Sequence, residues 1–130
     1  METTGIAGAG LLALLPGHSP CKAGRLYQTV VWDGKCRLPR GLRAHTIIQP
    51  GEAGDSGIAA VQVITCGSYH GDTLTVSSAM AAGMASLQRE ISRTDGGICT
   101  PCEIPLTGFG GNLQQRLLLA ALALRQGRFE

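Results

Sequence analysis

The segment of residues 113–125 constrains the fold of this chain more than any other feature. Its apolar side chains recur at helical spacing and form one stripe, made of Leu113, Leu117, Ala120, Ala121 and Leu124. Further leucines at positions 118, 119 and 122 extend the apolar surface around most of the circumference. Asn112 suits the N-cap of such a helix, and Gly127 suits its end behind Arg125. A helix this apolar is expected to be buried on more than one side or to meet a partner.

Several strand-forming runs precede this helix. Residues 28–32 are rich in β-branched and aromatic side chains, residues 45–49 form a second run, and residues 62–66 form a third with little polar alternation. Such continuous runs are typical of strands buried on both faces of a parallel sheet. Leu74 and Val76 alternate with threonines, which predicts a half-buried strand.

The remaining elements complete an α/β fold. Residues 94–97 (Thr-Asp-Gly-Gly) predict a hairpin turn between residues 86–91 and residues 98–106. Residues 6–15 fit a short helix or a buried strand, residues 58–61 predict one or two helical turns, and residues 79–85 fit a loop or a helical turn. We therefore expect a small mixed, partly parallel sheet with a β-hairpin and a C-terminal packing helix. Residues 1–130 form one domain, in which residues 1–25 are the part expected to be least ordered.

Composition and charge limit the kinds of molecule that the chain is expected to bind. The chain of 130 residues is 44% hydrophobic and 15% charged, which indicates a globular domain. A net charge of +2 gives no reason to expect nucleic acid as a partner. Six basic residues between positions 22 and 43 are read either as a solvated loop face or as a small anion site. We expect no signal peptide, because the apolar stretch of residues 5–15 follows Glu2 and not a basic leader. We expect no membrane association, because the apolar run of the terminal helix has only eight residues.

The five cysteines are an odd set without the spacing of a secreted disulfide scaffold, so we expect reduced thiols in a cytoplasmic protein. Cys99 and Cys102 form a Cys-x-x-Cys and are weak candidates for a zinc or redox site. A zinc ion would need two more ligands, and either Cys66 with His70 or Cys36 with His45 is available. The alternative is that these cysteines are structural. No cofactor is predicted.

The loop of residues 66–72 is the candidate ligand site. It follows the run 62–66, and ligands of open α/β sheets collect beyond the carboxyl ends of parallel strands. The candidate binding residues are Cys66, Gly67, Ser68, His70, Asp72 and, from the start of the terminal helix, Asn112. Cys66 with His70 would supply a nucleophile and a base. The alternative is ordinary turn chemistry, because Gly, Ser and Asp are standard turn residues.

Residues 44–127 resemble the second half of the central domain of Mur ligases. The strand end Cys66-Gly67, two antiparallel segments, and the helix start Gly110-Gly111-Asn112 follow one another as in that family. The resemblance implies that Asn112 helps to hold a nucleotide, while Gly111 and Gln115 stand where the family has His and a second Asn. The chain has no Gly-Lys-Ser/Thr loop for the phosphates, so ATP-driven ligation is not expected. Small uncharacterised bacterial proteins are also similar, through Asp72-Thr73-Leu74-Thr75 and Ser86-Leu87-Gln88-Arg89.

These observations predict a non-catalytic binding or accessory module related to Mur ligases, and hence to peptidoglycan precursor metabolism. A protein partner or a second copy of the chain would pack on the terminal helix. The first alternative is an enzyme that binds a small molecule or nucleotide at residues 66–72. The second is a structural protein stabilised by zinc.

Overall fold

The computed structural model describes residues 2–76 and 83–128 of the chain. In chain order its elements are β1 (Glu2–Ala7), α1 (Ala9–Leu14), β2 (Ser19–Pro20), β3 (Leu26–Trp32), β4 (Arg43–Pro50), the 3-10 turn η1 (Gly51–Ala53), β5 (Gln62–Gly67), β6 (Leu74–Val76), β7 (Met84–Leu87), β8 (Ile91–Ser92), β9 (Ile98–Cys99), β10 (Glu103–Pro105) and α2 (Leu113–Gln126).

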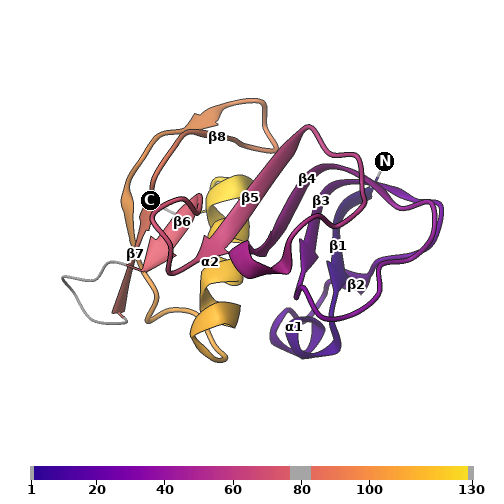
Figure 1. Cartoon of the computed structure of the whole chain (residues 1–130), viewed down its shortest axis with the longest axis horizontal. Coiled ribbons are helices and arrows are strands. Elements are labelled where there is room, and N and C mark those ends of the chain that lie inside the picture. Colours follow the sequence, from indigo (N-terminus) through magenta and orange to yellow (C-terminus); the bar gives the residue numbers. More distant parts are fainter. Residues whose placement is uncertain (1, 77–82, 129–130) are drawn as a thin grey trace.

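Eight of the described strands form one sheet in the order β10-β7-β6-β5-β4-β3-β1-β2. The strands from β6 to β2 are parallel to their neighbours, whereas β7 and β10 extend the sheet in antiparallel fashion. Figure 1 shows the sheet running across the molecule with α2 against one face. Strands β8 and β9 pair around the turn of residues 94–97 as a separate antiparallel hairpin. The predicted class, a mixed and partly parallel sheet with a hairpin and a closing helix, is confirmed.

Helix α2 begins and ends where its sequence signals place it. The Asn112 side chain accepts a hydrogen bond from the Gln115 backbone N–H, and the Gln115 side chain accepts one from the Asn112 N–H, which completes a capping box. Gly127 closes the helix in the left-handed conformation. The helix packs on β4, β5 and β6, and its side chains from position 117 to 122 are all buried. Burial within this chain thus accounts for the apolar side chains around most of α2. A partner that packs on α2 stays a prediction.

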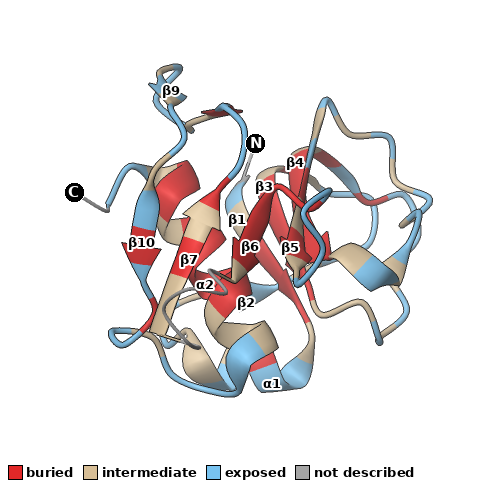
Figure 2. Cartoon of the chain, turned by 60° about the vertical axis from the view of Figure 1, so that its left-hand side comes forward, coloured by how far each residue is buried: buried red, intermediate tan, exposed pale blue. Residues whose placement is uncertain are grey.

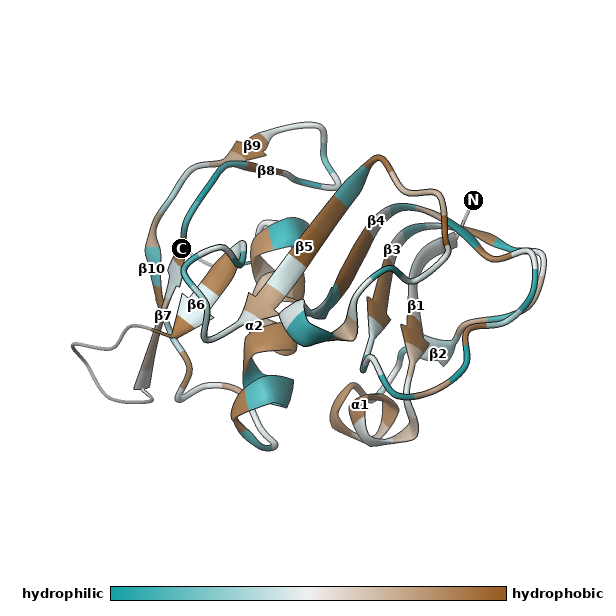
Figure 3. Cartoon of the chain, in the orientation of Figure 1, coloured by the Kyte–Doolittle hydropathy of each residue, from teal (hydrophilic) through white to brown (hydrophobic). Residues whose placement is uncertain are grey.

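The opposite face of the sheet is covered by loops instead of helices. Strands β3 and β4 place Val30, Trp32 and Ile47 on that face, in a second buried cluster with Tyr27. Leu42, from the loop before β4, belongs to the cluster, and the side chains packed against it include Cys36, Leu38, Ala53 of η1, Ile58 and Ala60. Figure 2 shows buried segments along both β3 and β4, and Figure 3 shows their hydrophobic character. These two strands are therefore buried on both faces, which explains their continuous apolar sequences.

Two local expectations are wrong. Residues 58–61 contain no helical turn, and a short 3-10 turn lies earlier, at Gly51–Ala53. Ile58 packs as a loop side chain on the sheet, so its apolar character serves that contact and not a helical stripe. Strand β5 is buried on one face only, because Ile64 and Cys66 lie in the core while Val63 is 49% exposed.

The N-terminal segment forms a strand followed by a short helix, and these are the two alternatives that its sequence allowed. Ile6 lies in β1, which pairs with β2 and β3, whereas Leu11 lies in the short helix α1. Gly8 separates the two with a φ of 144°, a conformation that favours glycine. Both Ile6 and Leu11 are buried in the main core with α2.

Three further expectations concern the surface. The basic side chains at positions 22, 25, 35, 37, 40 and 43 are all exposed. No helix in the described part of the chain combines the length and the apolar character needed to cross a membrane. The prediction for residues 79–85 falls mostly outside the described residues, since only residues 83–85 are described and Met84 begins β7.

Candidate functional site

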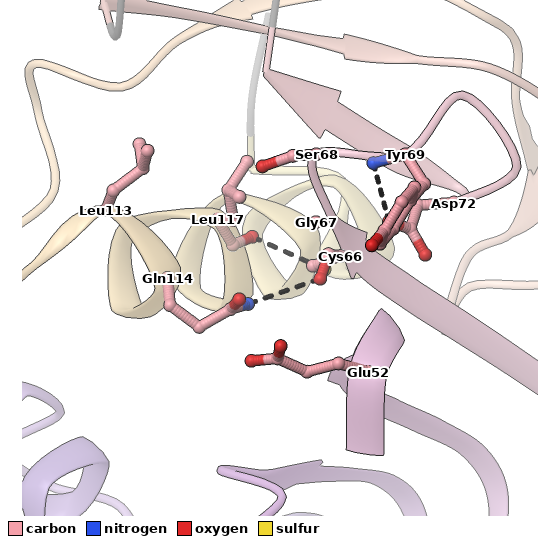
Figure 4. A pocket seen from close by; sticks show the side chains of 9 residues that line it. All are labelled: Glu52, Cys66, Gly67, Ser68, Tyr69, Asp72, Leu113, Gln114 and Leu117. Carbon is pink, nitrogen blue, oxygen red and sulfur yellow. Dashed lines mark hydrogen bonds between the residues drawn. The ribbon is translucent and has the colours of Figure 1, made fainter. Parts of the chain in front are cut away.

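A pocket of about 410 Å³ lies where the parallel strands β4 and β5 end. The first turns of α2 form its other wall (Figure 4). Its lining residues are Glu52, Cys66, Gly67, Ser68, Tyr69, Asp72, Leu113, Gln114 and Leu117. Four of the six candidate binding residues, Cys66, Gly67, Ser68 and Asp72, are thus brought together at the sheet edge where the sequence placed them.

The Asp72 carboxylate is the most deeply buried charged group of this pocket. Its side chain is 7% exposed, and its Oδ2 accepts a hydrogen bond from the Tyr69 backbone N–H at 3.3 Å. The carboxylate lies against the backbone of Gly51 and Gly67, where an added Cβ at either position would overlap it. These two glycines are therefore required for the close approach of the carboxylate and not for an unusual φ.

Cys66 lies in the wall of the pocket with its side chain turned into the core. Its thiol is fully buried and donates a weak hydrogen bond to the Leu117 carbonyl, with 3.8 Å between Sγ and O. Burial raises the pKa of this thiol strongly, and the nearby Asp72 charge raises the pKa further. The Cys66 backbone is also engaged, because its carbonyl accepts a hydrogen bond from Gln114 Nε2 at 3.3 Å.

Two candidate residues lie outside the pocket. His70 is exposed and does not line the pocket, so the structure does not assemble the nucleophile and base pair with Cys66. Asn112 lines a separate cavity of about 210 Å³ together with Asp33 and Lys35, and its side chain is used by the capping box. Asn112 therefore serves as the helix cap, and Gln114, two residues later, reaches the pocket instead.

Sequence reasoning missed five lining residues: Glu52, Tyr69, Leu113, Gln114 and Leu117. A usable signal existed for Glu52. It follows the run 45–49, and adjacent parallel strands bring their carboxyl ends to one edge of a sheet. The residues from α2 had no comparable signal, because the position of the helix on the sheet depends on long-range packing.

The electrostatic character of the pocket is acidic. Asp72 and the exposed Glu52 supply two carboxylates, and none of the nine described lining residues is basic. The ring of Tyr69 lies at the rim and is 74% exposed. Such a lining can accept hydrogen bonds from an ammonium group and offer it an aromatic face, whereas it has no cation for a phosphate.

The cysteines do not form a metal centre within the described residues. In that part of the chain, no group of three or more His, Cys, Asp or Glu side chains could hold a metal ion. Cys99 and Cys102 are neighbours, and burial together with the nearby Cys102 raises the pKa of the Cys99 thiol. All five cysteines of the chain are free thiols.

Comparisons with protein-family models, with curated protein sequences and with solved structures give no match.

Proposed function

We propose that this protein is a non-catalytic binding module that takes a small molecule with an ammonium group in the pocket of Asp72. The observation that carries the proposal is the buried Asp72 carboxylate, which is held at the carboxyl edge of a parallel sheet by close packing on Gly51 and Gly67. A buried carboxylate normally pairs with a cation or with several hydrogen-bond donors. Within the described residues, the Asp72 carboxylate accepts one hydrogen bond, from the Tyr69 N–H. An ammonium group of a ligand would supply the further hydrogen-bond donors.

The size and the remaining walls of the pocket fit this proposal. A volume of about 410 Å³ lies in the range of small-molecule sites. The apolar contacts come from Leu113 and Leu117 of α2, and Tyr69 offers an aromatic face to a cation. The ligand class is thus an amine with a modest apolar body, such as an amino sugar or an amino acid derivative.

A nucleotide at the same place is less favoured by the charges. Two carboxylates and no basic residue among the described lining residues would repel a triphosphate. The Cys66 thiol is buried and His70 does not line the pocket, so these two residues do not form a nucleophile and base pair there. These observations favour a binding module over an enzyme.

A relationship with Mur ligases is part of the same proposal. Its support is the order of strand β5, the antiparallel pair β7 and β10, and the Asn112-capped helix α2. On this view the module takes part in peptidoglycan precursor metabolism in the bacterial cytoplasm. The five free thiols support the reducing compartment.

The test is a thermal-shift titration with amino sugars, diamino acids, muropeptide precursors and nucleotides. We expect the amines to raise the midpoint of unfolding in a saturable way, because a ligand that binds only the native state stabilises it. Asp72→Asn keeps the shape of the side chain and removes its charge, so it should abolish the shift. Glu52→Gln, at an exposed position, should reduce the shift only slightly.

Two results would count against the proposal. One is a panel in which no amine shifts the midpoint. The other is an amine whose effect is the same in the native protein and in Asp72→Asn, since its site would then lie elsewhere.

A further inference from the structure

A second cavity, of about 360 Å³, lies between α1, the loop before α2 and the last turns of α2. It is separate from the pocket of Asp72 and shares no lining residue with it. Its wall is mainly apolar, with Leu14, Leu15, Phe109, Leu119, Leu122 and Ala123. The apolar lining and the volume match those of small-molecule sites.

The polar side chains that line this cavity are those of His18, Gln126 and Arg128. His18 and Arg128 also line an adjoining cavity of about 460 Å³, whose other walls include the hydroxyl-bearing side chains of Thr3, Thr4 and Ser19. The apolar space and the polar space therefore meet at His18 and Arg128. Among the described residues that line either cavity, none carries a carboxylate.

Within the part of the chain that the structure describes, the side chains of His18 and Arg128 both have polar atoms without a protein partner. The Nδ1 atom of His18 is buried and has no hydrogen-bond partner in the structure. Among the described residues, the Arg128 guanidinium makes no side-chain hydrogen bond or ion pair, although its backbone N–H bonds to the Ala123 carbonyl. A buried polar atom without a partner is uncommon in folded proteins and indicates an absent ligand or water.

We propose that this cavity binds an amphipathic monoanion, a medium-length alkyl carboxylate. The alkyl chain fills the apolar space beside Leu119 and Leu122, and the carboxylate lies between His18 and Arg128. A guanidinium matches a carboxylate with two parallel N–H···O bonds, and the imidazole supplies a further donor. The threonine and serine hydroxyls of the adjoining cavity would solvate the same head group.

The test is titration of the whole protein with octanoate, octylamine and octanol, followed by NMR chemical shifts of the His18 ring and of the α2 amides. Octanoate is expected to shift these signals in a saturable way. Octanol should bind at least about tenfold more weakly, because it lacks the charge that the guanidinium recognises. Octylamine should not bind, since its charge has the same sign as that of Arg128.

Matched variants locate the site. Arg128→Gln removes the charge at an exposed position and should weaken octanoate at least about tenfold. Ala123→Leu keeps a good helix former and fills the apolar space, so it should abolish binding. Asp72→Asn should leave octanoate binding unchanged, which separates this site from the amine pocket. Equal binding of octylamine and octanoate, or unchanged octanoate affinity in both Arg128→Gln and Ala123→Leu, would overturn the proposal.

Discussion

At the scale of single residues, Arg125 shows how this fold carries a charge in its interior. The residue is 1% exposed, and none of the hydrogen-bond partners of its guanidinium among the described residues is a carboxylate. The guanidinium donates to Thr29 Oγ1, to the Gln28 carbonyl, to His45 Nδ1 and to both oxygens of Ser92. Burial lowers the pKa of the guanidinium, yet the hydrogen bonds tie the end of α2 to β3, β4 and β8.

Replacing Arg125 should therefore destabilise the protein. Arg125→Met keeps much of the volume and leaves several acceptors without a donor, so we expect a loss of about 2–4 kcal/mol in the free energy of unfolding. Urea unfolding at neutral pH measures the loss. The matched control is Arg116→Met on the same helix, where the half-exposed side chain makes one hydrogen bond to a described residue, the Gly111 carbonyl. A loss no greater than in this control would show that the network contributes little.

Cys66 gives a prediction at alkaline pH. The native thiol stays protonated, whereas the unfolded thiol ionises above its ordinary pKa of 9.0. The unfolded state then binds fewer protons, so the contribution of Cys66 to stability is complete below pH 9 and declines above it. The slope is about 1.4 kcal/mol per pH unit.

The measurement is urea unfolding of the native protein and of Cys66→Ala between neutral and alkaline pH. The two proteins should differ by a constant amount below pH 9, and above it the native protein should lose stability faster. Parallel pH profiles throughout this range would contradict a raised thiol pKa.

At the scale of elements, α2 is the part that the sequence predicts best. Its cap residues, its apolar stripe and its terminal glycine are local signals, and local signals decide where a helix begins and ends. The resemblance to Mur ligases implied a second role for Asn112, in holding a nucleotide. In the structure the Asn112 side chain is occupied by the Gln115 N–H at 2.8 Å, so its effect on stability can be tested directly.

Asn112→Ala should lower the free energy of unfolding by about 1 kcal/mol, because the first turn of α2 loses its capping bond. Asn112→Asp is the matched control, since aspartate caps a helix as well as asparagine and its charge favours the N-terminal end of the helix. Urea unfolding followed by circular dichroism compares the two. Equal losses in both variants would exclude the capping role as the cause.

At the scale of the whole molecule, the sheet has a helix on one face and loops on the other. The sequence predicts strands β3, β4 and β5 from their composition, and it predicts the edge of the sheet where the pocket of Asp72 lies. It does not reveal that Ile58 packs on the sheet as part of a loop, or that Val63 of β5 stays exposed. Both depend on which distant surfaces meet, and hydrophobic periodicity within a segment carries no such information. For the same reason, the sequence does not predict which side chains of α2 line the pocket.

The order of the strands also leaves the sheet with two short outer strands, β2 and β10 (Figure 3). Each of them ends in proline, at Pro20 and Pro105. Proline has no N–H to donate, so an approaching strand from another molecule meets an interrupted row of hydrogen-bonding groups. A largely parallel sheet exposes its edges while it assembles, and these prolines protect both of them against edge-to-edge aggregation.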